Sequence, residues 1–348
     1  MIMMTLPSAN RVLAFIDAFR QSKTMFAAVA LGVFDRLRER NAGCAALAAE
    51  LAVEAGALER LLDGCVGLGF LQKANGVYSN LPVADAYLCR SSPHSLTGYI
   101  LYSNSVLYRL WGNLEDAVRE GTHRWKQTFE LDGPLFSHFF RTREAMRDFV
   151  TGMHGFGLLS SPAVVAAFDL SGFRRMVDLG GATGHLAMAA AERYPGLHAA
   201  VFDLPAVIEV AREFAGDRIE LIAGDFFRDP LPEADLFAVG RILHDWSQEK
   251  IGALLRKIRE ALAEGGALLI AEKLLDEDKE GPVPAHMQSL NMLVCTEGKE
   301  RTLSEYTVLL REAGFSEVRG RKTGAPLDVV LASKGKVPAT EGGPAESI

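Results

Sequence analysis

The sequence predicts an α/β protein whose C-terminal part is a doubly wound parallel sheet and whose N-terminal part is helical. The first observation is the stretch 177–184, Val-Asp-Leu-Gly-Gly-Ala-Thr-Gly, which reads as a strand, a tight glycine turn and the start of a helix. The second is the alternation of strand and helix patterns from residue 174 onward. The third is the helical spacing of apolar residues before that point.

The composition is that of a globular chain large enough for two hydrophobic cores. Of its 348 residues 49% are hydrophobic, and the net charge is -7. This acidic balance argues against a nucleic-acid surface. The four cysteines lie far apart and form no Cys-x-x-Cys pair, so they predict reduced thiols rather than zinc ligands or disulfides.

Neither an export signal nor a membrane span is expected. The first helical pattern contains the charged residues Arg11, Asp17 and Arg20, which a signal peptide would not carry in its apolar core. The longest apolar runs, such as 25–34, are too short to cross a bilayer. We therefore expect a cytoplasmic protein without a membrane partner.

Residues 1–93 predict a winged-helix-like domain. Val12, Phe15, Ile16 and Phe19 recur at helical spacing, and further helices are expected over 44–52 and 58–68. A hairpin follows over 70–78, with the dipeptide Asn-Gly at its turn. Helix, helix and hairpin in this order are typical of a winged helix.

DNA binding and dimerisation are the two candidate functions of this domain. Winged helices often bind DNA, but residues 1–160 contain sixteen Lys and Arg against fifteen Asp and Glu. So neutral a region lacks the positive field that phosphate binding requires. Packing against a second copy of the chain, as a dimerisation domain, is the better use of its small apolar helix positions, with plain intrachain core as the alternative.

Residues 94–335 predict the catalytic domain. Helices continue over 95–168, and seven strands are expected over 176–179, 199–204, 219–223, 236–242, 267–273, 316–322 and 328–332. Only a short Gly-Ala-Pro turn separates the last two strands, which predicts a terminal antiparallel hairpin. A seven-stranded sheet that ends in this way is the expected Rossmann-like shape of a class I methyltransferase. Residues 336–348, rich in Gly, Pro and Glu, are expected to be a disordered tail.

The glycine turn differs from a dinucleotide-binding loop. A G-x-G-x-x-G fingerprint would begin at position 178, but Asp178 stands there, followed by Gly180, Ala182 and Gly184. This pattern is closer to the acid-led loop of S-adenosylmethionine enzymes, in which the acid can meet the ammonium group of the cofactor through water or loop amides. The alternative is that the glycines only pack the helix on the strand.

Acidic residues follow the next two strands, where ligands of α/β sheets bind. Asp203 can accept both ribose hydroxyl protons; alternatively it caps the helix that begins at residue 205. Gly224, Asp225 and Phe226 follow the third strand, where the acid can accept from an adenine amino group and the ring can stack on the base. The alternative there is a surface turn with a core phenylalanine.

His244 follows the fourth strand and is the candidate general base. A phenol has a pKa near 10, whereas an imidazole with a pKa near 6.5 can take its proton as the methyl group arrives. Glu272 and Glu300 are candidates to hold the other ring nitrogen. A structural histidine and surface or salt-bridged glutamates are the alternatives.

Four motifs together resemble one enzyme family. Leu-His-Asp-Trp at 243–246, Gly-Asp-Phe-Phe at 224–227, Ser-Leu-Asn-Met-Leu-Val at 289–294 and Thr-Glu-Gly-Lys-Glu-Arg-Thr at 296–302 look like the acetylserotonin (hydroxyindole) O-methyltransferases and their caffeic-acid-type plant relatives. The similarity runs from about residue 9 to 334. It implies a homodimer formed through the N-terminal winged-helix domain, S-adenosylmethionine as cofactor and no metal.

The resemblance also implies site residues. Cofactor contacts are expected from Asp203, Gly224, Asp225, Phe226 and Arg241, with Phe140 as an aromatic cover. His244 matches the base, and Glu272 and Glu300 match the acids that flank it. Asp245 and Asn291 match substrate contacts. The chain departs from the family at Ala182, at Gly157 in place of a tryptophan over the cofactor, and at Cys295 in place of a substrate-contacting glutamine.

We therefore expect an S-adenosylmethionine-dependent O-methyltransferase that acts on a phenolic or hydroxyindole-like hydroxyl. Three alternatives stay open. The first is a magnesium-assisted catechol-type enzyme, but the Asp and Asn ligands that it needs are not clustered after the strands. The second is a same-fold enzyme that hydroxylates or decarboxylates a polyketide, and the third is a ligand-sensing winged-helix regulator. The departures at 157 and 295 argue against N-acetylserotonin itself as the acceptor.

Overall fold

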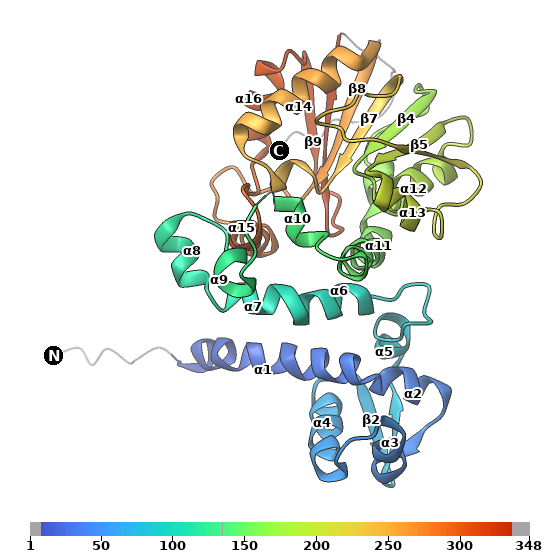
Figure 1. Ribbon diagram of the computed structural model, residues 1–348, viewed down its shortest axis with the longest axis vertical. Helices are drawn as coiled ribbons and strands as arrows, with labels where there is room; N and C mark the ends of the chain where they lie inside the picture. Colours follow the sequence, from blue (N-terminus) through green and yellow to red (C-terminus); the bar gives the residue numbers. More distant parts are fainter. Residues whose placement is uncertain (1–7, 134, 336–348) are drawn as a thin grey trace, which may run out of the picture. The chain divides into compact units, whose positions relative to one another are not determined.

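The computed structural model of the protein describes residues 8–133 and 135–335 (Figure 1). The chain forms two compact units, Met1–Tyr108 and Arg109–Ile348. The domain boundary drawn from the sequence after residue 93 stays a prediction, and the tail predicted over 336–348 lies outside the described residues.

The first unit has the helix and strand order of a winged helix. A three-stranded sheet in the order β1-β3-β2 packs with the helices around one hydrophobic core. The hairpin expected over 70–78 is present as β2 and β3, whereas β1 pairs with β3 and was not predicted. The elements are α1 (Asn10–Leu31), α2 (Val33–Glu39), β1 (Ala42–Gly43), α3 (Cys44–Leu51), α4 (Ala55–Gly67), β2 (Leu71–Ala74), β3 (Val77–Asn80), α5 (Pro82–Tyr87), α6 (Thr97–Tyr102) and the π-helical turn η1 (Ser103–Leu107).

The hairpin turn has the backbone that its sequence demands. Asn75 and Gly76 both have positive φ, 51° and 77°. Two consecutive left-handed residues match the twist of the flanking strands, and Asn-Gly tolerates them best. The predicted hairpin is therefore confirmed.

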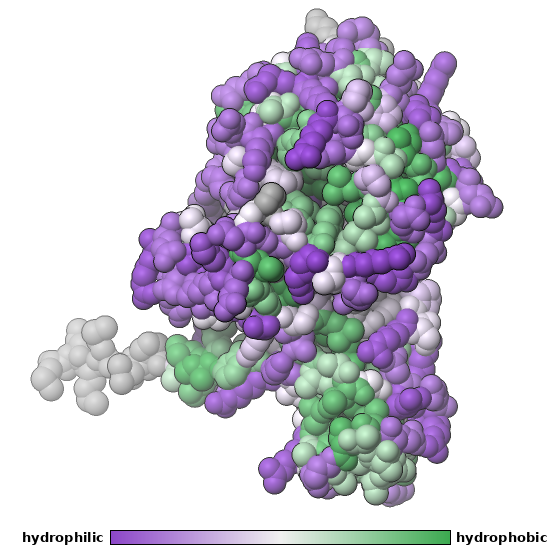
Figure 2. Space-filling model, in the orientation of Figure 1, coloured by the Kyte–Doolittle hydropathy of each residue, from purple (hydrophilic) through white to green (hydrophobic). Residues whose placement is uncertain are grey.

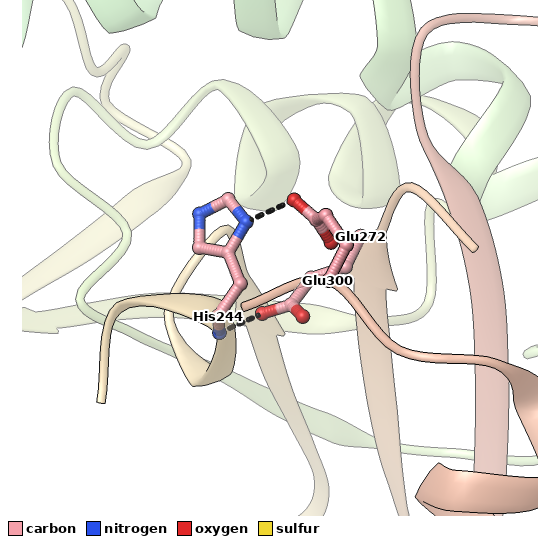
Figure 3. A group of neighbouring side chains, drawn as sticks. All are labelled: His244, Glu272 and Glu300. Carbon is pink, nitrogen blue, oxygen red and sulfur yellow. Dashed lines mark hydrogen bonds and ion pairs between the residues drawn. The ribbon is translucent and has the colours of Figure 1, made fainter. Parts of the chain in front are cut away.

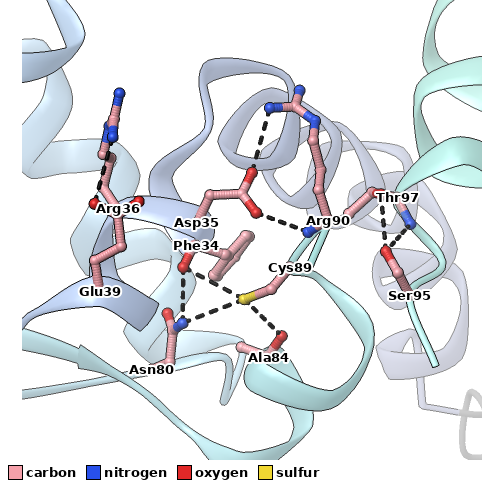
Figure 4. Close-up of polar contacts among 10 residues, drawn as sticks. All are labelled: Phe34, Asp35, Arg36, Glu39, Asn80, Ala84, Cys89, Arg90, Ser95 and Thr97. Carbon is pink, nitrogen blue, oxygen red and sulfur yellow. Dashed lines mark hydrogen bonds and ion pairs between the residues drawn. The ribbon is translucent and has the colours of Figure 1, made fainter. Parts of the chain in front are cut away.

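Polar contacts tie the hairpin and the segment after α5 to α2 (Figure 4). Asp35 accepts the backbone N–H of Arg90 at 2.7 Å and pairs with its guanidinium at 3.3 Å. Asn80, the last residue of β3, donates to the carbonyl oxygen of Phe34 at 2.9 Å. These bonds satisfy backbone groups at the edge of the core and fix the wing against α2.

One half of α1 leaves its apolar side chains in solvent. Val12, Leu13, Phe15, Ile16 and Phe19 are 53–70% exposed, whereas Ala28 and Val29 near the other end are buried. Figure 2 shows the apolar surface at the N-terminal end of this helix. A group of large exposed apolar side chains is typical of a surface that a partner covers.

The second unit begins with short helices rather than the longer ones predicted over 95–168. Left-handed residues end two of them: Gly121 after α8 and Glu130 after α9. Only α11 is long, with 24 residues. The helices before the sheet are α7 (Tyr108–Trp111, which begins at the end of the first unit), α8 (Leu114–Glu120), α9 (Trp125–Phe129), α10 (Leu135–Phe139) and α11 (Arg143–Ala166).

A seven-stranded sheet follows, as predicted, in the order β6-β5-β4-β7-β8-β10-β9. Strands β4 to β8 pair in parallel, and β10 runs antiparallel to both β8 and β9, which confirms the terminal hairpin. The strands are β4 (Arg175–Leu179), β5 (His198–Asp203), β6 (Ile219–Ala223), β7 (Ala234–Gly240), β8 (Leu262–Glu272), β9 (Glu317–Arg321) and β10 (Asp328–Ser333). The other elements are α12 (His185–Arg193), α13 (Pro205–Ala211), the 3-10 turn η2 (Leu243–Asp245), α14 (Gln248–Ala261), α15 (Val283–Cys295) and α16 (Leu303–Glu312).

Each face of the sheet is covered by helices, and alternating side chains of the strands fill two cores. Val177 and Leu179 of β4 pack with α14 and α16, whereas Met176 packs with α11 and α12 on the other face. This two-residue alternation is why the strands read as continuous apolar runs in the sequence. The strand order reverses between β4 and β7, so their carboxyl ends bound the crevice where ligands of such sheets bind.

Helix α11 belongs to this core although its composition resembles a membrane span. Within the described residues it is the one helix long and apolar enough to cross a membrane, a resemblance that the sequence analysis missed. Met146 and Val150 pack against α13, and Val164 and Val165 pack with α12. A core helix passes the same test of length and composition.

Helix α11 approaches α12 through a glycine. A Cβ built on Gly157 would lie 2.3 Å from the Cδ2 atom of His185, the first residue of α12. The imidazole is further held by Ser161, whose Oγ lies 2.9 Å from Nδ1. Because burial lowers the pKa of His185 to about 3, the ring is neutral at physiological pH.

Gly157→Ala is therefore expected to destabilise the protein. The new methyl group overlaps the imidazole, and overpacking of this kind costs about 1–3 kcal/mol of unfolding free energy. Chemical denaturation measures the loss. Gly172→Ala is the control, since a Cβ there meets no atom within 4 Å. The double variant Gly157→Ala with His185→Ala should regain most of the stability; an equal loss in both backgrounds would contradict the contact.

Candidate active site

The turn after β4 requires glycine at two positions that bear φ values of 68° and 82°, Gly180 and Gly184. A Cβ on Gly180 would lie 2.5 Å from the Cδ1 atom of Ile242. Ala182 also has a positive φ, 51°, and it packs against the apolar cluster formed by α11 and α13. The apolar contact of its methyl group explains how alanine is accommodated in place of a third glycine.

Asp178 lies beneath this turn. It is 1% exposed, and a Cβ on Gly181 would lie 2.6 Å from its Oδ2 atom. Oδ2 has no hydrogen-bond partner among the residues that the structure describes. Burial, with the nearby charge of Asp203, raises the pKa of Asp178 to about 8. Because the turn covers Asp178, this acid can affect a ligand only by positioning the turn.

Asp203 joins the end of β5 to the same turn. Its Oδ2 atom accepts the backbone N–H of Ala182 at 2.9 Å, and Oδ1 accepts that of Leu204 at 2.7 Å. Leu204 is itself the N-cap residue of α13, so the carboxylate does not bond to the first turn of that helix. The side chain is partly exposed, and burial raises its pKa to about 6 against the effect of the two N–H donors.

The turn after β6 meets the turn after β4. Phe226 lies against Gly180, since a Cβ on that glycine would be 3.3 Å from the Cε1 atom of Phe226. Asp225 closes its own turn by accepting the N–H of Phe227 at 2.8 Å. Gly224 is required for packing, because a Cβ there would lie 2.3 Å from the ring of Phe202. Three strand ends thus converge on one place.

The candidate base lies in η2, just beyond β7, and is held from two sides (Figure 3). His244 is 2% exposed. Its Nδ1 atom lies 2.6 Å from Oε1 of Glu300, and its backbone N–H donates to Oε1 of Glu272 at 3.0 Å. The structure therefore separates the two acids: Glu300 orients the ring, and Glu272, the last residue of β8, holds the backbone.

Burial shifts the pKa values of His244, Glu272 and Glu300. It lowers the pKa of His244 below its usual value, although the charges of Glu272 and Asp245 oppose the shift. Burial also raises the pKa of Glu300 to about 8 and that of Glu272 above its usual value. With Nδ1 bonded to Glu300, Nε2 is the nitrogen left for a substrate; its nearest carboxylate oxygen, on Asp245, is 3.8 Å away.

Arg241 precedes the base with a strained backbone. Its φ is 57°, in the left-handed region that an arginine rarely adopts, and its N–H donates to the carbonyl oxygen of Ala271 at 3.0 Å. The guanidinium lies over the ring of Phe156, 4.7 Å from its centre. Its charge opposes the burial that raises the pKa of Asp245 to about 6.

The three candidate substrate residues lie on η2 and α15. Asn291 accepts the indole N–H of Trp111 through Oδ1 at 2.9 Å. The thiol of Cys295 donates to the carbonyl oxygen of Asn291 at 2.8 Å, and Trp125 donates to that of Cys295 at 2.8 Å. The sequence analysis did not assign these tryptophans to the site, because no local pattern links residues so far apart in the chain.

An aromatic ring of α10 covers Trp246, which lies two residues after the base. Phe136 stacks on the indole with 5.1 Å between ring centres, and Phe140 lies 5.7 Å from Phe136. Phe140 also packs against the α11–α13 cluster on which Ala182 lies. Phe140 and Ala182 therefore pack on the same apolar cluster, and the role of Phe140 as an aromatic cover stays a prediction.

His244, Glu272 and Glu300 also satisfy the distance test for a metal site, with one ligand atom of each within 4.8 Å of the others. Most of their ligand atoms, however, already contact protein groups, although Oε2 of Glu300 has no hydrogen-bond partner among the described residues. Glu272 accepts from the backbone of His244 and from the hydroxyl of Tyr306, and Glu300 contacts Nδ1. These contacts orient the imidazole.

Comparison with known proteins places these features in a family. Residues 111–316 match the model of the O-methyltransferase domain, and residues 13–90 match that of the O-methyltransferase dimerisation domain. The chain is 42% identical to acetylserotonin O-methyltransferase of Bos taurus over 92% of its own length and 96% of the relative's. It is 41% identical to the Gallus gallus enzyme of that name, with 93% and 96% covered.

A solved structure shows the same fold. The crystal structure of human N-acetylserotonin methyltransferase, in complex with S-adenosylmethionine, superposes with a TM-score of 0.91 at 40% identity, and 95% of this chain and 99% of that one are covered. The class I methyltransferase fold and the N-terminal dimerisation domain predicted from the sequence are confirmed. The chain belongs to the O-methyltransferase family.

Proposed function

We propose that the protein transfers the methyl group of S-adenosylmethionine to the hydroxyl of a hydroxyindole or related phenol, with His244 as general base. The observation that supports this most directly is the buried pair of His244 and Glu300 beyond the end of β7, the strand beside the glycine turn of β4. The similarity to enzymes named for acetylserotonin supports the acceptor class.

The residues at the strand ends fit the cofactor. Gly180 gives the turn its left-handed backbone and its close contact with Ile242, and Asp203 presents a partly exposed carboxylate bonded to the same turn. We assign cofactor contacts to these two residues, with Gly184, Gly224, Asp225, Phe226, Arg241 and Phe140 around them and Asp178 acting through the turn. When bound, S-adenosylmethionine supplies a methyl group that its sulfonium already activates.

The protein supplies alignment, exclusion of water and one base. With the shared proton on Nδ1 and directed at Glu300, Nε2 has a free lone pair and takes the proton of the acceptor hydroxyl. The carboxylates of Glu300 and Glu272 stabilise the imidazolium that forms. The depressed pKa of His244 keeps the ring in its neutral, basic form at physiological pH.

The three residues that we assign to the acceptor offer few free amide groups. Oδ1 of Asn291 is occupied by Trp111, which leaves its Nδ2 atom as a donor, and position 295 offers a thiol already bonded to the backbone. Asp245 is the remaining polar contact that we assign to the acceptor. Such a set of side chains selects an acceptor that needs few hydrogen bonds.

We further propose that the protein is a cytoplasmic homodimer. The dimerisation-domain match and the exposed apolar half of α1 support pairing through the N-terminal unit. Nucleic acid and membrane are not part of the proposal.

Transfer from labelled S-adenosylmethionine to a panel of hydroxyindoles and phenols, including N-acetylserotonin, tests the function. We expect label in at least one hydroxyindole or phenol, at a rate that EDTA does not change because the base is oriented by carboxylates. Labelling of amines alone, or full dependence on a divalent cation, would contradict the proposal.

His244→Ala is expected to abolish transfer, with a loss of at least about 100-fold in kcat, because general-base catalysis typically contributes that much. Calorimetry should show unchanged affinity for S-adenosylhomocysteine. In the wild type, kcat should fall as the pH is lowered, because protonation of the base removes its lone pair; the depressed pKa of His244 moves this fall below the range of a free imidazole, whereas a fall that begins near pH 8 would mark protonation of Glu300. Near-normal turnover of the variant would show that His244 is not the base.

Asp203→Ala should weaken binding of S-adenosylhomocysteine by about 1–3 kcal/mol, the scale of a lost hydrogen bond to a charged group. Asp203→Asn, which keeps an acceptor for the N–H of Ala182, should lose less. In the wild type, calorimetric affinity should weaken as the pH falls through about 6, where the carboxylate becomes protonated and loses acceptor capacity. Unchanged affinity in both variants would remove Asp203 from the cofactor site.

A further inference from the structure

Tyr306 contacts the catalytic group from a helix to which the sequence analysis assigned no site residue. It lies in α16 and is fully buried in the core between that helix and the sheet. Its hydroxyl donates to Oε2 of Glu272. The other oxygen of this carboxylate accepts the backbone N–H of His244 at 3.0 Å. One buried carboxylate thus connects the tyrosine with the backbone of the base.

The segment that leads into α16 provides the second contact to the base. Glu300, whose Oε1 lies 2.6 Å from Nδ1 of His244, precedes the helix by three residues. Thr302 caps the helix in a reciprocal capping box with Glu305 and forms a β-bridge with Leu275, just beyond β8. The start of α16 is therefore fixed, and with it the positions of Glu300 and Tyr306.

The two contacts restrain different parts of the histidine. Glu300 fixes the rotation of the ring, whereas Glu272 fixes the 3-10 turn from which the ring projects. Glu272 is 1% exposed, and a buried carboxylate needs donors for both oxygens. The hydroxyl of Tyr306 is the donor on the side away from His244, and burial raises its pKa well above the usual value, so it stays protonated.

We propose that Tyr306 is a positioning residue for methyl transfer: its hydroxyl orients the carboxylate of Glu272, which holds the backbone at His244. This inference rests on the proposed function of His244 as the base. Tyr306 touches neither substrate nor cofactor in this assignment, and its effect reaches the chemistry only through Glu272.

Other charged groups surround this network and are left unchanged by the test. Arg241 and Asp245 lie on either side of the base, Arg301 precedes α16, and Asp328 of β10 pairs with Lys273 at 3.0 Å. The hydrogen bond from Tyr306 favours the ionised form of Glu272, whose charge raises the pKa of His244. Without the hydroxyl, Glu272 becomes easier to protonate and His244 becomes a weaker base.

Tyr306→Phe keeps the ring in the core and removes only the donor. We expect kcat to fall about tenfold, the scale of one hydrogen bond to a charged group. The KM for the acceptor and the Kd for S-adenosylhomocysteine should stay within about twofold, because neither is bound by this hydroxyl. The acid limb of the kcat profile should move to lower pH. Tyr78→Phe, which removes a hydroxyl bonded to Asp63 in the first unit, is the matched control and should leave kcat unchanged.

A double-mutant cycle separates positioning from packing. In a Glu272→Gln background, Tyr306→Phe should lower kcat by no more than about twofold, since its target is already altered. An equal loss in both backgrounds would show that the tyrosine acts by packing alone, and a wild-type kcat and pH profile for Tyr306→Phe would also overturn the proposal. If His244 is not the base, the variant His244→Ala stays active. This result distinguishes failure of the proposed function from failure of the proposal for Tyr306. Thermal melting of each variant separates lost folding from lost positioning.

Discussion

The hydrogen bond between Nδ1 of His244 and Glu300 is the interaction on which the proposed chemistry depends. Both groups are almost fully buried, and an isolated charge in such a place would cost several kcal/mol. The hydrogen bond between the two groups offsets the desolvation cost of burying either charged form. It leaves a neutral imidazole with one defined nitrogen free, which is what a base for an acidic hydroxyl needs at physiological pH.

The architecture of the sheet brings the other parts of the site to this bond. Parallel strands deliver their carboxyl ends to one edge, and the reversal of strand order between β4 and β7 opens a crevice there. Asp203 bonds to the glycine turn, and Phe226 packs on Gly180, so the turns after three strands support one another. Helix α16 supplies Tyr306, and the segment that leads into it supplies Glu300.

The N-terminal unit follows a different constraint. Its winged-helix core is closed by its own apolar residues, yet half of α1 leaves large apolar side chains in solvent. The family match assigns this region to dimerisation, which accounts for a surface that would otherwise be a liability. The near-neutral charge of this part of the chain agrees with a protein partner rather than DNA.

The sequence alone was enough to predict the seven strands of the large sheet, their ends and the N-terminal hairpin, because period-two patterns, Asn-Gly and glycine turns are local signals. It also placed Asp203, His244 and Glu272 at those ends and named Glu300 as a second acid that could hold the histidine ring. It did not show that the helices between 95 and 142 are short, since left-handed caps such as Glu130 have no strong local signature. Other contacts became visible only in the folded structure. It shows which glutamate contacts which atom of His244, and that the ring of His185 occupies the place of a side chain at position 157. It also shows that Trp111 and Tyr306 contact residues of the site. The physical reason is distance along the chain: these contacts join residues tens to more than a hundred positions apart, and packing of separate helices against the sheet selects them.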